Sequence, residues 1–214
     1  MGSDYTALIA DDHPLFRSAL NQVLSQQLKL SVEQADNFSQ TYAALQKNPD
    51  IDVVCLDLNM PDTDGLSGII RLRAEFPNTL IIVVSGEENP LIIAKCIALG
   101  ASGFIPKSVS LESISQAVTA VLDGEQWIPP DFEMPERQSQ QHEQYRMLET
   151  LTPHQLKVLN MIAKGLLNKQ IAYELDISES TVKQHASAVL RKLGVNNRTQ
   201  AGIMFKQLMS LEQG

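Results

Sequence analysis

The chain has 214 residues, 43% of them hydrophobic, which is enough for one ordinary domain and a small second one. Its formal net charge of -8 argues by itself against nucleic acid as a partner, but the charge is unevenly spread. Residues 1–135 carry 7 basic and 18 acidic residues, a balance of -11, whereas residues 148–214 carry 8 and 5, a balance of +3. The two ends therefore have opposite electrostatic character.

Composition also bears on where the protein works. No apolar run approaches the roughly 20 residues that a membrane span needs, and the first residues lack the basic and apolar regions of a signal peptide. The two cysteines, Cys55 and Cys96, both lie in apolar patterns, as small buried hydrophobic residues do in a reducing compartment. We expect a cytoplasmic protein with no membrane partner.

Residues 4–128 alternate between short apolar runs and amphipathic patterns of helical period. The first amphipathic pattern follows Pro14, with Leu15, Leu20, Val23 and Leu24 as its expected buried positions. Strands are predicted at 6–10, around 30–32, and at 53–56, 80–84 and 103–105, with helices between and after them, including 66–76, 90–99 and 111–122. Five such repeats with short connections predict an α/β doubly wound five-stranded parallel sheet, covered by helices on both faces.

Polar residues follow four of the predicted strands: Asp11 and Asp12, then Asp57, Ser85 and Lys107. The carboxyl ends of strands in a doubly wound sheet converge, so these side chains should meet. Three carboxylates close together repel, so they either raise each other's pKa or hold a hard divalent cation such as Mg²⁺. Beside the cation Asp57 can attack phosphorus, while Lys107 and Ser85 bind the phosphoryl oxygens. Each residue alone also has a structural explanation: Asp12 as a helix cap, Ser85 as a turn hydroxyl and Lys107 as a solvated lysine. Their occurrence together at the ends of consecutive strands favours a functional site.

Over residues 4–128 the sequence resembles the receiver domain of bacterial two-component response regulators. The motifs that carry the resemblance are Asp11-Asp12, Asp57 within Asp-Leu-Asn-Met-Pro-Asp-Thr-Asp-Gly, Ser85-Gly86, Gly100-Ala101 and Lys107. The resemblance implies a flavodoxin-like sheet of order 2-1-3-4-5 and a phosphoryl group received from a sensor histidine kinase. The chain departs from the family where Ser85 replaces the common threonine and where Pro106 precedes the lysine instead of following it.

The same resemblance assigns roles to individual residues. Asp57 is implied as the phosphoacceptor, with Lys107 beside it. Mg²⁺ is implied to bind Asp12, Asp57 and the backbone carbonyl of Asn59, with Asp11 assisting. Ser85 and Phe104 are implied as the switch pair. The receiver is also expected to catalyse its own phosphoryl transfer and dephosphorylation, without being an enzyme in the metabolic sense.

Residues 129–148 are rich in proline and polar residues and are predicted to be a linker. From 149 to 214 the sequence predicts a small all-α domain of four helices and no strand. Thr152, Pro153 and Gln155 form a capping box at the first helix, and Ser178 caps the third. A short second helix at 168–175, a tight turn and the longer third helix describe a helix-turn-helix.

One side of the third helix is cationic and able to form hydrogen bonds. At about 100° per residue, Lys183, Gln184, Ser187 and Arg191 lie opposite the apolar positions. We expect the first three to meet base edges in the major groove, and Lys169, Arg191 and Lys192 to contact phosphates. A helical dimerisation module with a solvated charged face is the alternative.

Residues 149–210 resemble the LuxR-type helix-turn-helix, through Leu-Thr-Pro, Asn-Lys-x-Ile-Ala, Ser-x-x-Thr-Val-Lys-x-His and Lys-Leu-Gly-Val. Gln155 and Gln170 stand where that family usually has glutamate. His185 is expected to pack within the domain. His13, His142 and His154 have no metal-ligand spacing with one another, so no zinc site is predicted.

Together the two resemblances indicate a NarL/FixJ-family response regulator, a transcription factor whose DNA binding is controlled by phosphorylation of Asp57. The expected partners are a sensor histidine kinase, double-stranded DNA and a second copy of the chain, with RNA polymerase as a further candidate. Two other classes use part of the same residues: a protein-binding relay module that does not bind DNA, and a Mg²⁺-dependent phosphotransferase with an aspartyl-phosphate. The second of these would need a substrate-binding insertion, for which the connections are too short.

Overall fold

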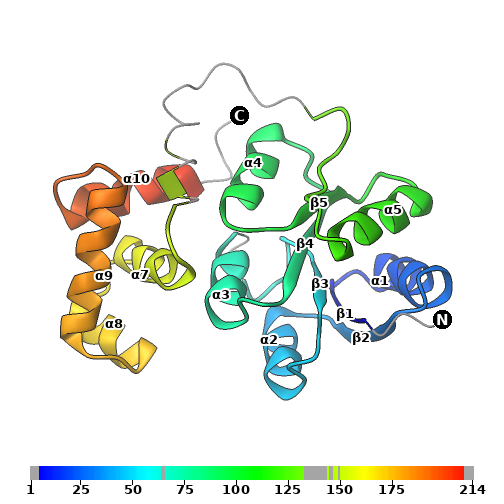
Figure 1. Ribbon diagram of the computed structural model, residues 1–214, viewed down its shortest axis with the longest axis horizontal. Coiled ribbons are helices and arrows are strands. Elements are labelled where there is room, and N and C mark those ends of the chain that lie inside the picture. The colour runs from blue at the N-terminus through cyan, green and yellow to red at the C-terminus, as the bar shows by residue number, and fades with distance from the viewer. Residues whose placement is uncertain (1–4, 64–65, 133–143, 145–146, 149, 210–214) are drawn as a thin grey trace. The chain divides into compact units, whose positions relative to one another are not determined.

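Residues 5–63, 66–132, 144, 147–148 and 150–209 are described in a computed structural model of the chain (Figure 1). The chain divides into two compact units, Met1–Met134 and Pro135–Gly214, and each is described by itself. Most of the predicted linker at 129–148 lies outside the described residues. Among the described helices, none combines the length and apolar character needed to cross a membrane.

The first unit is built on a parallel sheet of five strands. These are β1 (Thr6–Ala10), β2 (Ser31–Ala35), β3 (Val53–Leu56), β4 (Leu80–Ser85) and β5 (Gly103–Pro106). Their order is β2-β1-β3-β4-β5, which confirms the predicted 2-1-3-4-5 arrangement. β2 extends beyond the predicted strand around 30–32. It is a partly exposed edge strand, and its polar residues give no continuous hydrophobic pattern from which its full length could be predicted.

Both faces of the sheet are buried, which explains the unbroken apolar runs of the central strands. Side chains alternate between faces, so Ile9, Cys55 and Ile82, paired across three strands, share one core cluster. That face packs against α1 (Pro14–Asn21), the following π-helical segment η1 (Gln22–Gln27) and α5 (Leu111–Leu122). Their neighbours Val54 and Val83 point to the other face and are 0% exposed.

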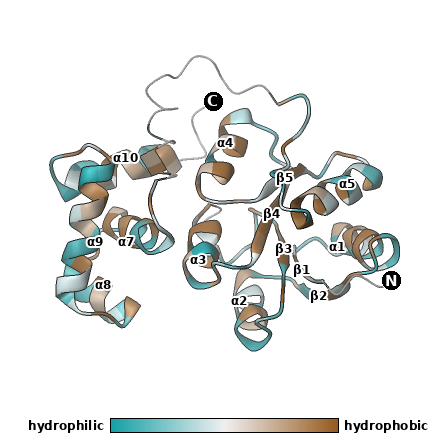
Figure 2. Ribbon diagram, in the orientation of Figure 1, coloured by the Kyte–Doolittle hydropathy of each residue, from teal (hydrophilic) through white to brown (hydrophobic). Residues whose placement is uncertain are grey.

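That other face is covered by α2 (Phe38–Lys47), α3 (Ser67–Glu75) and α4 (Pro90–Ala98) (Figure 1). Figure 2 shows the hydrophobic colour along β4 and a mixture of both colours around the flanking helices, as amphipathic helices require. The two helical layers leave the carboxyl ends of the strands uncovered, and these ends carry the polar residues predicted from the sequence.

The predicted buried face of α1 is wrong at one position. Leu15 is 89% exposed, whereas Leu20, Val23 and Leu24 are buried as expected. Phe16 takes the place assigned to Leu15 and packs against the same core cluster. The spacing of 16, 20, 23 and 24 follows a single helical face, whereas position 15 is rotated about 100° away from it.

A loop-to-helix contact ties β3 to α2. Asp62, in the loop after β3, accepts hydrogen bonds from the backbone N–H groups of Phe38 (2.6 Å) and Ser39 (2.8 Å) and from the Ser39 hydroxyl (2.6 Å). Desolvation alone would raise the pKa of Asp62, but these hydrogen bonds outweigh it and lower the pKa. The carboxylate satisfies two N–H groups that have no partner inside the first turn of α2.

The second unit consists of α7 (Pro153–Ala163), α8 (Asn168–Leu175), α9 (Glu179–Lys192) and α10 (Arg198–Met209). The capping box of Thr152 and Gln155 is present, and Ser178 caps α9 through a bond from the Thr181 N–H, as predicted. The turn between α8 and α9 contains Asp176 in the left-handed conformation, with φ of 50°. A core cluster that includes Val158, Ile171 and Val182 joins the first three helices.

We predict that Leu20→Ala lowers the free energy of unfolding of the first unit by about 2–5 kcal/mol, because it leaves a cavity in the core. Leu15→Ala, only five positions away, should change it by less than about 0.5 kcal/mol, because the side chain is exposed. Urea unfolding of the full chain, followed by fluorescence, measures both, since the single tryptophan, Trp127, packs against this core. A larger loss for Leu15→Ala than for Leu20→Ala would contradict the observed face of α1.

Asp62→Ala should speed hydrogen exchange at the amides of Phe38 and Ser39, which lose their acceptor. Ser39→Ala is the matched control, since it removes only the hydroxyl bond and leaves both backbone bonds to Asp62 in place. Exchange rates of individual amides measured by NMR make the comparison. An unchanged rate at Phe38 in Asp62→Ala would show that the loop does not hold α2 in solution.

Candidate functional site

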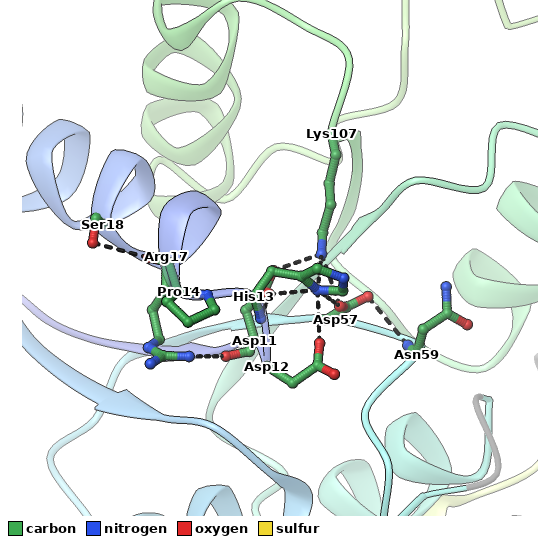
Figure 3. A network of polar contacts seen from close by, with 9 residues as sticks. All are labelled: Asp11, Asp12, His13, Pro14, Arg17, Ser18, Asp57, Asn59 and Lys107. Atoms are coloured by element: carbon green, nitrogen blue, oxygen red, sulfur yellow. Dashed lines mark hydrogen bonds and ion pairs between the residues drawn. The ribbon is translucent and has the colours of Figure 1, made fainter.

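A polar pocket lies at the carboxyl ends of the strands (Figure 3). Asp11 and Asp12 directly follow β1, Asp57 follows β3, and Lys107 follows β5. Asp11 and Asp57 are each only 1% exposed, although both are carboxylates. The parallel order β1-β3-β4-β5 brings residues nearly 100 positions apart in the sequence to one place, because equivalent ends of parallel strands share an edge.

Lys107 connects the two most buried carboxylates. Its Nζ lies 2.7 Å from Oδ2 of Asp11 and 2.8 Å from Oδ2 of Asp57. The ammonium also lies 5.0 Å from the ring centroid of Phe16, within the range of a cation–π contact. Burial alone would lower the pKa of Lys107, but the hydrogen bonds to Asp11 and Asp57 and their negative charges raise it. The lysine therefore stays cationic and neutralises part of the buried charge.

Asp57 is oriented from two sides. Its Oδ1 accepts a hydrogen bond from the backbone N–H of Asn59 at 3.1 Å, while its Oδ2 faces Lys107. The N–H of Asp57 itself donates to the carbonyl of Ala10 at 2.8 Å, which extends the β1–β3 pairing by one residue. These bonds hold the carboxylate at the strand end, facing the pocket.

The donor set fits a hard divalent cation. Three carboxylates and one ammonium give the pocket a formal charge of -2, which such an ion would balance. Oδ2 of Asp11 and Oδ1 of Asp12 are buried, and each has one close partner among the described residues: Nζ of Lys107 at 2.7 Å for Asp11 and Nδ1 of His13 at 2.7 Å for Asp12. Buried carboxylate oxygens with so few partners are costly unless a cation offsets their charge.

His13 belongs to the pocket, which sequence reasoning missed. Its Nδ1 lies 2.7 Å from Oδ1 of Asp12, 3.2 Å from Oδ1 of Asp11 and 3.6 Å from Oδ2 of Asp57. One atom from each of these four residues lies within 4.8 Å of all the others. The sequence did contain a signal for this position, because His13 directly follows two acidic residues at a strand end. The spacing between histidines, which was the basis for excluding a zinc site, does not detect a histidine beside carboxylates.

The two residues expected to form the switch pair lie at the neighbouring strands. Ser85 ends β4, is 0% exposed, and its Oγ accepts a hydrogen bond from the Glu87 N–H at 3.1 Å. Phe104, in β5, is also 0% exposed. The backbone of Lys107 donates to the Ser85 carbonyl at 2.8 Å, so β4 helps to place the lysine. Among the described residues every peptide bond is trans, including the one before Pro106.

The second unit presents most of the predicted DNA contacts on its surface. The exposed side chains are Lys169 on α8 and Lys183, Gln184, Ser187 and Arg191 on α9. Lys192 differs, because it is half-buried and its Nζ donates to the Thr150 carbonyl (2.6 Å) and to Oε1 of Gln155 (2.8 Å). Its charge is engaged in fastening α9 to the start of α7.

His185 lies on the side of α9 that faces α7. Its ring stacks on that of His154, with 6.4 Å between the ring centroids and 21° between the planes. The side chain is half-buried, in keeping with the expected packing role. Arg198, at the start of α10, binds the Asn168 side chain (2.9 Å) and the Leu166 carbonyl (2.5 Å), and so fixes the beginning of α8.

Two family models match the chain, one on each unit. The model of the response regulator receiver domain matches residues 7–119. The model of bacterial regulatory proteins of the luxR family matches residues 149–205.

Individual proteins match over nearly the whole length. The chain is 40% identical to a glycerol metabolism activator of Pseudomonas putida, over 92% of this chain and 93% of that one. It is 31% identical to the nitrate/nitrite response regulator NarL of Escherichia coli, covering 94% and 95%. Among solved structures it is similar to RcsB of Salmonella enterica serovar Typhimurium bound to a promoter with the phosphomimetic BeF3-, with a TM-score of 0.57, 26% identity and coverage of 95% and 98%. The chain belongs to the NarL/FixJ family of two-component response regulators, with a receiver domain followed by a LuxR-type helix-turn-helix domain.

Proposed function

We propose that this response regulator binds double-stranded DNA under the control of phosphorylation at Asp57, with a sensor histidine kinase as phosphodonor. The observation that carries the proposal is the contact of Asp57 Oδ2 with Lys107 Nζ at 2.8 Å, beside the carboxylates of Asp11 and Asp12. This is the arrangement needed to make a carboxylate nucleophilic toward phosphorus and to receive the charge of the phosphoryl group.

Each pocket residue has a chemical task in the transfer. An oxygen of Asp57 attacks the phosphorus, forming a P–O bond as the P–N bond to the kinase histidine breaks. Lys107 is placed to pair with a phosphoryl oxygen, and the Ser85 hydroxyl to donate a hydrogen bond to another. We propose that the receiver in this way catalyses both its own phosphorylation and the later hydrolysis.

Mg²⁺ is the proposed cofactor of the pocket. Asp11, Asp12, Asp57 and the backbone carbonyl of Asn59 would hold it, and the closeness of the three carboxylates, with one oxygen each within 4.8 Å of the others, supports this assignment. When bound, the cation would offset the repulsion between the carboxylates and the incoming phosphoryl group. Phe104, buried on the neighbouring strand β5 and paired with Val83, two residues before Ser85, is the proposed partner of Ser85 in reporting the modification.

The helix-turn-helix is the proposed output. Lys183, Gln184 and Ser187 are exposed near the start of α9, where a recognition helix meets base edges. Lys169, exposed near the start of α8, and Arg191, exposed near the end of α9, are assigned to phosphates. Lys192 was expected to contact phosphate as well, but its bonds to Thr150 and Gln155 favour an internal role over a direct one.

The assembly on DNA is proposed to be a homodimer. A solved structure similar to the chain, with a TM-score of 0.57 and 26% identity, is described as two RcsB dimers bound to two parallel DNAs. A two-fold symmetric dimer places its two recognition helices on two half-sites, so the operator should contain an inverted repeat of a short sequence. RNA polymerase is a further proposed partner, since transcriptional regulators act on it.

Asp57→Ala should abolish phosphorylation by a small phosphodonor in the presence of Mg²⁺. Intact-mass spectrometry of the full chain should show one added phosphoryl group in the wild type and none in the variant. Asp62→Ala serves as the control, since Asp62 lies in the same loop but faces α2, and it should still be modified. Full modification of Asp57→Ala would place the phosphoacceptor elsewhere.

Lys183→Ala should reduce the preference for a selected binding sequence over random DNA, because a lysine–guanine contact contributes roughly 1–3 kcal/mol of discrimination. Arg191→Ala should instead weaken binding to both DNAs equally and lower the salt slope by about one. Fluorescence anisotropy titrations at several salt concentrations separate the two effects. An equal loss on both DNAs for Lys183→Ala would make Lys183 a phosphate contact, and binding of neither DNA by the wild type would indicate a relay module.

A further inference from the structure

The position of the His13 ring at the acidic pocket is not explained by the roles assigned so far. The side chain is 62% exposed, so the hydrophobic core does not enclose it, yet its Nδ1 lies near three different carboxylates (Figure 3). The nearest oxygen, Oδ1 of Asp12, is a buried atom with no partner other than this nitrogen among the described residues. A nitrogen atom therefore lies among the oxygens proposed to hold the cation.

The separations match those between ligands of one metal ion. With metal–ligand bonds of about 2.0–2.2 Å, neighbouring ligand atoms are roughly 3 Å apart in an octahedron and somewhat further in a tetrahedron. Nδ1 of His13 is 2.7, 3.2 and 3.6 Å from the oxygens of Asp12, Asp11 and Asp57. A single ion could therefore bind the nitrogen and these oxygens with small side-chain movements.

We propose that Nδ1 of His13 is a further ligand of the pocket and gives it a preference for first-row transition ions, such as Co²⁺, over Mg²⁺. The inference rests on the cation site of the proposed function. Imidazole nitrogen suits Co²⁺, Ni²⁺ and Zn²⁺, whereas Mg²⁺ takes oxygen ligands and retains water. His13 therefore contributes to the binding of the transition ion, and a water molecule replaces it when Mg²⁺ is bound.

The ring also has the freedom this requires. His13 immediately precedes α1, whose first helical residue is Pro14, and its backbone is extended, with φ of -89° and ψ of 106°. Its N–H donates to Oδ1 of Asp11 at 2.7 Å, which holds the backbone close to the carboxylates whichever way the exposed ring turns. The backbone thus stays anchored at the pocket while the side chain can enter or leave the coordination sphere.

Isothermal titration of the full chain with Co²⁺ and, separately, with Mg²⁺ tests the proposal. His13→Ala should lower the affinity for Co²⁺ by about tenfold or more, a loss typical of metal-site changes, and the affinity for Mg²⁺ by less than about threefold. The visible absorption of bound Co²⁺ should also shift, since a nitrogen ligand is exchanged for water. His154→Ala, which removes an exposed histidine of the other unit, should alter neither affinity.

Three results would overturn the proposal. An unchanged Co²⁺ affinity and spectrum in His13→Ala would show that the nitrogen is not a ligand. Equal losses for both ions would make His13 a residue that only positions Asp12. Loss of Co²⁺ binding in His154→Ala would place the ion at a surface histidine.

A separate variant tests the underlying cation site. Asp12→Ala should weaken binding of both ions. If it left Mg²⁺ binding unchanged, the proposed cation site itself would be wrong. If instead Asp12→Ala weakens Mg²⁺ binding while His13→Ala changes neither ion, only the role of His13 fails.

Discussion

The ion pairs of Lys107 with Asp11 and Asp57 are the interaction on which the first unit depends. Two carboxylates that are each 1% exposed would be strongly unfavourable without a cation, and removing one member of such a buried pair generally costs about 3–5 kcal/mol. The lysine follows β5, and the carboxylates follow β1 and β3. These ion pairs therefore form only when the strands are arranged in the observed order. The folded state thus keeps the Asp57 carboxylate buried beside a cationic side chain before any phosphoryl group or metal ion arrives.

The side chains of the pocket differ in how firmly their neighbours hold them. The Ser85 carbonyl and the Phe16 ring hold Lys107, and the Asn59 N–H holds Asp57. Asp62 fastens the following loop to the start of α2 through the backbone N–H groups of Phe38 and Ser39. The His13 side chain, in contrast, is 62% exposed and meets the carboxylates and Lys107 through Nδ1, so it has more freedom than the buried Asp11 and Asp57 to adapt to what the pocket binds.

In the second unit, the basic residues serve two different purposes. Its balance of +3 is modest for a DNA-binding domain, so the placement of charge matters more than the amount. Lys192 and Arg198 are engaged in hydrogen bonds that join α9 to α7 and α10 to α8, whereas Lys169, Lys183 and Arg191 remain exposed. Basic residues in this small domain thus divide between holding the helices together and facing solvent.

The sequence by itself determined the class of fold and the caps of the helices, because apolar periods of two and 3.6 residues and capping side chains act locally. The strand order was implied by the resemblance to receiver domains. The sequence also predicted that Asp11, Asp12, Asp57 and Lys107 would meet, since parallel strand ends converge. Only the tertiary structure decided that Leu15 is exposed, that Lys192 bonds within its own unit, and that His13 joins the carboxylates. These outcomes depend on which neighbour from a distant segment comes within hydrogen-bond or packing distance, and local periodicity carries no information about that.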